Sequence, residues 1–507
     1  MQIDNDLAKN LELVYSYQKE IFVLQQTLAL LGWDERTYMP KKAAESRAEQ
    51  NAFIEGLIHE KITSEKLYTA LETLKKERLE NKEALMIEKL HKEVLRARKI
   101  PKELVEEIAK IASIAYNSWI KAKEESNFSI LAPVLEKIVE LKIKKAKCII
   151  SSNCLYDNLL DYYEEGMTAE KLRPIFEKLK AGLKELLKRI ENSENYKNQK
   201  IMPDKILEAR PQLELARELA KSMGLSEDNF RIDTTEHPFS TKISSEDVRI
   251  TTNVRKGVFN SLSSSIHEMG HALYSLNLPK EDAYNILGQE ASTGLHESQS
   301  RFWENMIGLG RPFWEYFFPK FNSKYNLQGN FEEWYQDINA VFPGKIRIES
   351  DEIHYCLHII LRFEIELGLI EGKIKVKDLP KVWNEKMKEI FGYTPKNDRE
   401  GVLQDVHWST GEFGYFPTYA IGTIYAAQLY DSIKRDIPNI GGDIFQGNFS
   451  RISEWLTKKV HIRGSKLLAD DIIKNTCGSG LNPEVFLEYL NKKYSEIYDL
   501  EKIKTSN

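Results

Sequence analysis

Apolar residues recur at the spacing of one helical face through most of this chain, and that pattern limits its fold more than any other feature. In residues 101–126 the apolar face is formed by Leu104, Ile108, Ile111, Ala115 and Trp119. Pro101 suits the first turn of that helix. Residues 127–150 and 168–193 follow the same period, and Thr168 has the position of an N-cap. The sequence therefore predicts amphipathic helices as far as about residue 225.

One segment departs from the helical pattern. In residues 229–254, NFRIDTTEHPFSTKISSEDVRITTNV, β-branched and aromatic residues alternate with polar ones between short turn signals. This predicts a small antiparallel sheet, after which the helical period resumes. No repeat, low-complexity tract or long linker marks a domain boundary. We therefore expect one large, mainly α domain over residues 1–507, with a helical part at 1–225, the sheet at 229–254 beside the working centre, and a second helical part at 255–507.

The charge balance and the cysteines exclude several classes of protein. With 72 basic and 77 acidic residues the formal net charge is −5, which gives no electrostatic case for nucleic acid or an anionic membrane as partner. The first ten residues lack the basic start and apolar run of a secretory signal, and the apolar segment at residues 21–33 is too short and too polar to cross a membrane. The four cysteines show no CxxC spacing, so we expect reduced thiols and a cytoplasmic protein.

The strongest local signal is the motif HEMGH at residues 267–271. Residues on either side of it hold apolar helical spacing, at Val258, Leu262, Ile266, Met269, Leu273 and Leu276. Asn253 is the expected N-cap of this helix. His267 and His271 then stand at positions i and i+4, so both imidazoles project from one face at a separation that a single metal ion bridges. Glu268 lies about 100° round the helix, near the site without being a ligand.

Three interpretations without a metal have to be weighed. H-E-x-x-H arises by chance in roughly 2% of chains of this length, so the motif needs further support. Ser265 and Glu268 have the spacing of a capping box, but the apolar periodicity already begins upstream at Val258. The histidines could also be core residues with satisfied hydrogen bonds. They lie on the face away from the apolar stripe, which favours the metal.

A catalytic zinc site usually has three protein ligands and one open position, so a third ligand is expected. Asn277, six residues past the second histidine, excludes the metzincin pattern. Three candidates remain. Glu290 lies 19 residues past His271 (290 − 271), as in zinc aminopeptidases, while His296 and Glu297 follow in the motif HES, with Glu297 lying 26 residues past His271 (297 − 271). Spacing alone does not choose between them.

A wider set of motifs runs through the chain in a fixed order. They are WDERTYMP (33–40), HPF (237–239), DVRIT (247–251), HEMGH (267–271), HESQSR (296–301), IRIESDE (346–352), GVLQDVHW (401–408) and GYFPTY (414–419). In these motifs, over nearly its whole length, the chain resembles the carboxypeptidase Taq family of zinc-dependent metallocarboxypeptidases. Two departures fall on no expected ligand: Ser350 stands where the family usually has Ala, and TCGSG at 476–480 where Thr-Gly-Glu is common.

The resemblance implies a complete metal site. In the family the third ligand is the Glu of HES, so Glu297 would join His267 and His271, and Glu268 would be the general base. His296 would then at most support a ligand from behind. The resemblance also implies a mostly helical fold with a deep groove, a homodimer, and zinc as the metal, with cobalt as a possible alternative.

A carboxypeptidase must also recognise the free C-terminal carboxylate of its peptide. Arginine suits this task because its planar fork binds a carboxylate through two hydrogen bonds. Arg347 in IRIESDE and Arg249 in DVRIT are the candidates, and we favour Arg347. The alternative for each is a structural ion pair, for instance with Asp351 or Asp247.

Donors are needed for the oxyanion that develops during peptide hydrolysis. His237, Tyr415 and Tyr419 lie in family motifs and are candidates that the sequence does not rank. His407 is expected near the groove, or as a structural histidine bonded to Asp405.

Together these observations predict a metallocarboxypeptidase that releases amino acids from the C-termini of peptides. A zinc oligoendopeptidase of related helical fold is the alternative, since it shares the metal chemistry without a carboxylate clamp. A helical peptide-binding protein without catalytic activity would need a degenerate metal motif, whereas HExxH is intact here.

Overall fold

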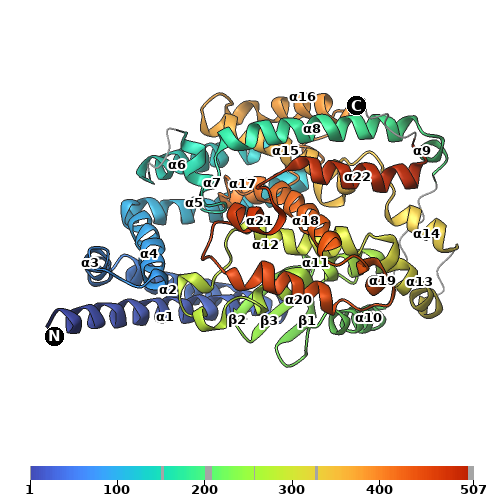
Figure 1. Cartoon of the computed structure of the whole chain (residues 1–507). Coiled ribbons are helices and arrows are strands. Elements are labelled where there is room, and N and C mark those ends of the chain that lie inside the picture. Colours follow the sequence, from blue (N-terminus) through green and yellow to red (C-terminus); the bar gives the residue numbers. More distant parts are fainter. Residues whose placement is uncertain (1, 150–153, 200–207, 256, 326–328, 501–507) are drawn as a thin grey trace.

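The computed structural model describes residues 2–149, 154–199, 208–255, 257–325 and 329–500, and it is dominated by helices (Figure 1). The helices before the sheet are α1 (Gln2–Thr37), α2 (Ala44–Ile62), α3 (Glu65–Leu74), α4 (Asn81–Lys99), α5 (Lys102–Glu125), α6 (Ala132–Ile149), α7 (Leu155–Leu160), α8 (Ala169–Asn192), α9 (Glu194–Asn198) and α10 (Ala209–Ser222). The helices expected at 101–126, 127–150 and 168–193 correspond to α5, α6 and α8. Thr168 caps α8 as predicted, because its hydroxyl accepts a hydrogen bond from the backbone N–H of Lys171.

The sheet has three strands, β1 (Phe230–Thr234), β2 (Ser240–Ser244) and β3 (Asp247–Thr252), in the order β1-β3-β2. The prediction of an antiparallel sheet is wrong for one of its two pairings, since β1 runs parallel to β3 and only β2 is antiparallel to it. The connection at residues 235–239 explains the difference. It is held to β3 at both ends, by Thr235 N–H to the carbonyl of Thr252 and by Thr251 N–H to the carbonyl of Phe239. The chain therefore crosses the end of β3 to reach its other edge.

The helices after the sheet form the second half of the molecule. They are α11 (Val258–Leu276), α12 (Thr293–Arg301) with its π-helical continuation η5 (Phe302–Ile307), α13 (Arg311–Tyr325), α14 (Phe331–Ile338), α15 (Glu352–Ile370), α16 (Leu379–Phe391), α17 (His407–Thr410), α18 (Pro417–Asp436), α19 (Ile440–Phe445), α20 (Ser450–Lys459), α21 (Ala469–Cys477) and α22 (Pro483–Tyr498). Asn253 does not cap α11. Its side chain accepts from the backbone N–H of Arg255, forming a turn that precedes the helix, and Gly257 takes the cap position.

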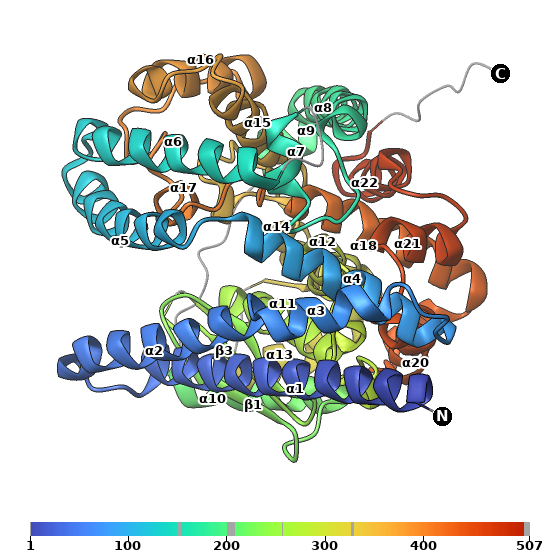
Figure 2. The same cartoon turned by 90° about the vertical axis from the view of Figure 1, so that its left-hand side faces the viewer.

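Helices α11 and α12 lie between two layers of the molecule, as both views show (Figures 1 and 2). One layer holds α1, α2 and the sheet, and the other holds α6, α8, α15 and α16. Almost every residue of α15 is buried, so this helix is a central support of the larger core, whereas a smaller core joins α1, α3 and α4. Among the described residues, none of the helices is long and apolar enough to span a membrane.

Candidate metal centre

Two glycines allow three helices to meet closely at the centre of the molecule. A Cβ atom on Gly270 of α11 would lie 2.5 Å from the carbonyl oxygen of Gln299 in α12. A Cβ atom on Gly422 of α18 would lie 2.8 Å from the side chain of Glu297. Real Cβ contacts are not this short, so α12 can lie against α11 and α18 only because these positions are glycine. The close approach brings the Glu297 side chain to the histidines of HEMGH.

Three potential ligand atoms converge at this point. Oε2 of Glu297 lies 3.6 Å from Nε2 of His267 and 3.4 Å from Nε2 of His271. All three atoms lie within 4.8 Å of one another. Ligands about 2.1 Å from one tetrahedral ion would be about 3.4 Å apart, so the separations fit a single ion. Glu290, the alternative from sequence spacing, is exposed and does not belong to this group.

Each histidine ring is oriented by a hydrogen bond at Nδ1, the nitrogen that faces away from Glu297. Nδ1 of His267 lies 2.8 Å from Oε2 of Glu304, and Nδ1 of His271 lies 3.1 Å from the backbone carbonyl of His296. Because a carboxylate and a carbonyl only accept hydrogen bonds, each Nδ1 carries a proton, and Nε2 is the nitrogen that faces Glu297. The His296 ring stacks on His271 at 4.4 Å between centroids, so this histidine supports a neighbour and is not part of the ligand group.

The carboxylate of Glu297 is held in its ionised form. Nε of Arg301 donates to Oε1 across 2.8 Å, and the hydroxyl of Ser300 lies 3.1 Å from Oε2. Burial opposes ionisation, but His267 and Arg301 outweigh it and hold the pKa of Glu297 well below its usual range. Glu268 behaves differently, because burial dominates there and raises its pKa. The site thus contains Glu297, which stays ionised at neutral pH, and Glu268, which can hold a proton.

Arg347, the favoured carboxylate clamp, is buried and bound to Asp405. Its Nε and Nη2 lie 2.9 and 2.7 Å from Oδ1 of Asp405, while Arg362 of α15 donates from Nε to Oδ2 across 2.7 Å. The predicted ion pair between Arg347 and Asp351 is wrong. Asp351 caps α15 and bonds to His354 instead.

Tyr355 connects Arg347 with the metal centre. Its ring centroid lies 4.0 Å from the guanidinium carbon of Arg301 and 5.8 Å from that of Arg347. Nη1 of Arg347 also donates to the Tyr355 hydroxyl across 3.3 Å. Since Arg301 binds Glu297, a continuous set of contacts runs from the carboxylate of Glu297 to Arg347.

An aromatic cluster lies beside Arg347 and consists of Tyr415, Tyr419 and His407. The Tyr419 ring lies 5.3 Å from Tyr415 and under the guanidinium of Arg347, at 5.1 Å. His407 bonds through Nε2 to the Tyr419 hydroxyl at 3.3 Å, and not to Asp405 as the alternative held. Burial lowers the pKa of His407 to about 4, so this ring is neutral at pH 7.

Two of the expected substrate residues lie elsewhere. Arg249 on β3 forms an ion pair with Asp247, with N–O distances of 3.0 and 2.8 Å, and stacks on Trp33 at 4.3 Å. His237 is exposed in the connection between β1 and β2, and it makes no hydrogen bond, ion pair or ring contact with a described residue.

Sequence reasoning overlooked Glu304, Tyr355 and Arg362. Glu304 lies seven residues after Glu297, so the spacing of Glu297, Arg301 and Glu304 already places three charged groups on one helical face. Arg362 follows His354 and His358 at intervals of four in a helix that is otherwise apolar, which is a comparable signal. Tyr355 carries no such pattern.

A family model for the carboxypeptidase Taq (M32) metallopeptidases matches residues 14–494. The chain belongs to this family. Thermostable carboxypeptidase 1 of Thermus thermophilus is 37% identical over 503 residues, covering 95% of this chain and 98% of that protein. Carboxypeptidase 1 of Bacillus subtilis is 36% identical, with coverage of 96% and 99%. The crystal structure of the M32 carboxypeptidase from Deinococcus radiodurans superposes with a TM-score of 0.93 at 31% identity, covering 97% of this chain and 100% of that one.

As an M32 carboxypeptidase the protein is a peptide hydrolase that depends on a divalent metal ion. The residues present fit such an ion. Two imidazole nitrogens and a carboxylate oxygen face one point, and the second nitrogen of each imidazole is engaged from behind.

Proposed function

We propose that the protein is a zinc-dependent carboxypeptidase in which His267, His271 and Glu297 hold the metal and Glu268 is the general base. The observation that carries this proposal is the convergence of the three ligand atoms within 4.8 Å. Imidazole and carboxylate donors suit zinc, and they also accept cobalt. The larger core draws on residues from Ala115 to Tyr498, which supports one metallocarboxypeptidase domain over residues 1–507. We further propose that the protein acts in the cytoplasm, as a homodimer and without nucleic acid.

Glu268 performs the proton transfers in this mechanism. When bound, a divalent metal ion supplies Lewis acidity, which polarises the scissile carbonyl and lowers the pKa of a water molecule to about 7. Glu268 accepts a proton from that water and delivers it to the leaving amine. Its burial suits this role, because the raised pKa lets the carboxyl hold the proton between the two steps.

Arg347 binds the C-terminal carboxylate of the peptide. Two buried guanidinium groups, Arg347 and Arg362, share the single carboxylate of Asp405, which leaves one positive charge without an ion-pair partner among the described residues. His407 does not add to this charge, because its pKa is lowered. A substrate carboxylate would balance the charge, and Tyr355 and Tyr419 hold the guanidinium in place for it. We assign Arg249 a structural role in its ion pair with Asp247.

Tyr415 and Tyr419 are the proposed hydroxyl donors to the developing oxyanion. Their rings pack against each other, and the Tyr419 ring also lies under the guanidinium of Arg347. Burial raises the pKa of each, which keeps the phenol protonated and able to donate. His407 orients Tyr419 through its hydrogen bond. The exposed His237 has no contact that supports such a role.

The experiment that tests the function compares two forms of one peptide. A peptide blocked at its N-terminus is incubated with the zinc-loaded protein, and the products are followed by mass. We expect single residues to leave from the C-terminus of the free acid and the C-terminal amide to be resistant. Equal cleavage of both forms would contradict carboxylate recognition and favour the alternative, an oligoendopeptidase of related fold.

A further inference from the structure

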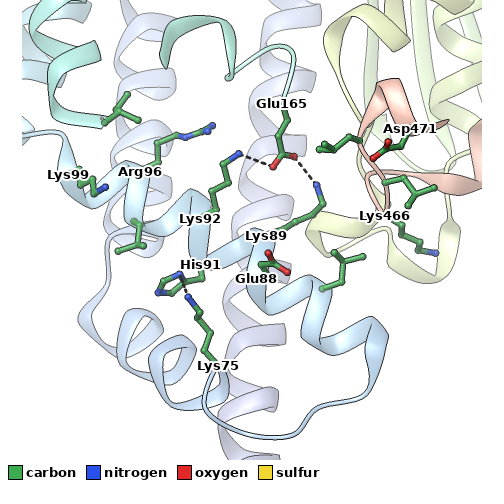
Figure 3. A pocket seen from close by; sticks show the side chains of 15 residues that line it. Lys75, Glu88, Lys89, His91, Lys92, Arg96, Lys99, Glu165, Lys466 and Asp471 are labelled. Atoms are coloured by element: carbon green, nitrogen blue, oxygen red, sulfur yellow. Dashed lines mark hydrogen bonds and ion pairs between the residues drawn. The ribbon is translucent and has the colours of Figure 1, made fainter. Parts of the chain in front are cut away.

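A cavity of about 620 Å³ opens between α4, the segment that follows α7, and the start of α21 (Figure 3). It shares no residue with the metal centre. Six of its lining residues are basic and three are acidic. The basic ones are Lys75, Lys89, Lys92, Arg96, Lys99 and Lys466.

A carboxylate of the chain itself lies between two of these lysines. Glu165 bonds to Lys89 at 2.9 Å and to Lys92 at 2.8 Å, and both lysines project toward it from one face of α4 (Figure 3). The two ammonium groups converge on a single carboxylate and hold the pKa of Glu165 at about 2, against the effect of its partial burial. The geometry is that of an anion site whose anion is supplied by the protein.

Acidic neighbours pair with several of these cations. Asp161 binds both Arg96 and Lys92. Lys145 and Arg96 both lie against the Tyr162 ring, with cation-to-centroid distances of 4.3 and 4.8 Å, and Lys145 makes no ion pair with a described residue. Burial, and then the charge of Arg96, lower the pKa of Lys145.

Apolar side chains form the rest of the wall. Leu85 and Leu95 come from α4, and Leu467 and Leu468 from the segment before α21. Leu467 is 38% exposed, so part of its side chain is accessible to a ligand in the cavity. The volume lies within the range of small-molecule sites, which is about 300–1,000 Å³.

We propose that this cavity binds a small organic phosphate monoester, whose phosphate replaces Glu165 between Lys89 and Lys92 and whose carbon chain packs on the leucines. A dianionic phosphate offers three acceptor oxygens to the two ammonium groups, whereas Glu165 offers two. Glu165 is displaced toward solvent, to which 29% of its side chain is already exposed.

The test is calorimetric titration of the metal-loaded protein with methyl phosphate and hexyl phosphate. We expect one site, with hexyl phosphate bound more tightly by up to about fourfold for each buried methylene. Changing Lys89→Gln and Lys92→Gln together should weaken binding roughly tenfold to hundredfold, since charge-assisted bonds are lost. Lys102→Gln with Lys121→Gln is the matched control, because these lysines pair only with exposed glutamates one turn away on α5.

Glu165→Gln provides the second, independent arm. It removes the internal competitor while keeping the size of the side chain, so it should tighten phosphate binding several-fold. This arm decides the proposal if the double lysine variant does not fold. Absence of binding at millimolar ligand, equal binding by wild type and the Lys89/Lys92 variant, or no effect of Glu165→Gln would each overturn it. Equal binding would place the phosphate at the metal centre instead.

Discussion

Glu304 and His267 lie 2.8 Å apart, and their hydrogen bond fixes the imidazole proton on Nδ1. Glu304 is itself held by the hydroxyl of Ser263 at 2.9 Å and by Arg301 at 3.4 Å. It lies in the π-helical continuation of α12, whose wider turn changes the direction of the side chains after Arg301. The irregular turn therefore has a role, which is to place a carboxylate behind a proposed metal ligand.

Replacing Glu304 should weaken metal binding without destroying the fold. Glu304→Ala leaves His267 free to rotate and to take the other tautomer, so the metal dissociation constant should rise by about 10–100-fold. Competition with a chelator measures it. Glu332→Ala, which removes an exposed partner of Arg311, is the control and should have no effect. Unchanged affinity in Glu304→Ala would mean that the packing around His267 alone fixes the ring.

The third ligand is tested by two matched substitutions. Glu297→Gln should abolish metal retention, because a neutral amide replaces the only carboxylate that faces both histidines in the described group. Glu290→Gln should retain the metal, since Glu290 is exposed and outside that group. Metal content after gel filtration distinguishes the two. The reverse result would assign the site to the aminopeptidase spacing.

Arg347→Met should separate binding of the carboxylate from the chemistry of hydrolysis. Loss of a charge-assisted pair costs roughly 1.5–3 kcal/mol or more, so kcat/KM for a free-acid peptide should fall about 10–100-fold or further. The slow cleavage of the amidated peptide should not change. Arg231→Met removes a half-exposed ion pair from β1 and should leave both substrates unaffected. A parallel loss for both peptides would indicate that Arg347 only supports the structure.

The sequence predicted what local spacing determines and missed what long-range packing determines. His267 and His271 share a face because of helical geometry alone, so HEMGH sufficed. Glu297 needed the family motif, because nothing in the spacing distinguishes it from Glu290. Asp405, the partner of Arg347, lies 58 residues further along the chain, and local sequence patterns do not predict contacts between such distant residues. The parallel β1–β3 pairing was missed for the same reason, because it depends on where a five-residue connection crosses the sheet.

Gly422→Ala, a substitution in α18, should displace the side chains of the metal centre. The new Cβ would lie 2.8 Å from the Glu297 side chain and from the carbonyl of Gly294, so α18 and α12 would have to separate. Overpacking of this kind costs about 1–3 kcal/mol, and Glu297 should move with α12, which weakens metal affinity. Gly441→Ala in α19 has open space around it and is the control. Unfolding by urea and metal titration measure both effects. Normal affinity in Gly422→Ala would show that the helices yield without moving the ligand.

Glu164 should make the stability of the fold depend on pH. Its carboxyl accepts a hydrogen bond from the backbone N–H of Gly294 at the start of α12, and burial raises its pKa from 4.5 to about 8. Between these two pH values the folded protein keeps a proton that the unfolded chain has lost, so this group lowers the free energy of unfolding as the pH rises.

Glu164→Gln keeps the carbonyl acceptor and removes the titration. The variant should therefore gain stability relative to wild type between about pH 4.5 and pH 8, measured by urea unfolding at both ends of the range. Glu49→Gln on the exposed face of α2 is the control. A constant difference between Glu164→Gln and wild type across the range would show that Glu164 is ionised in the folded state.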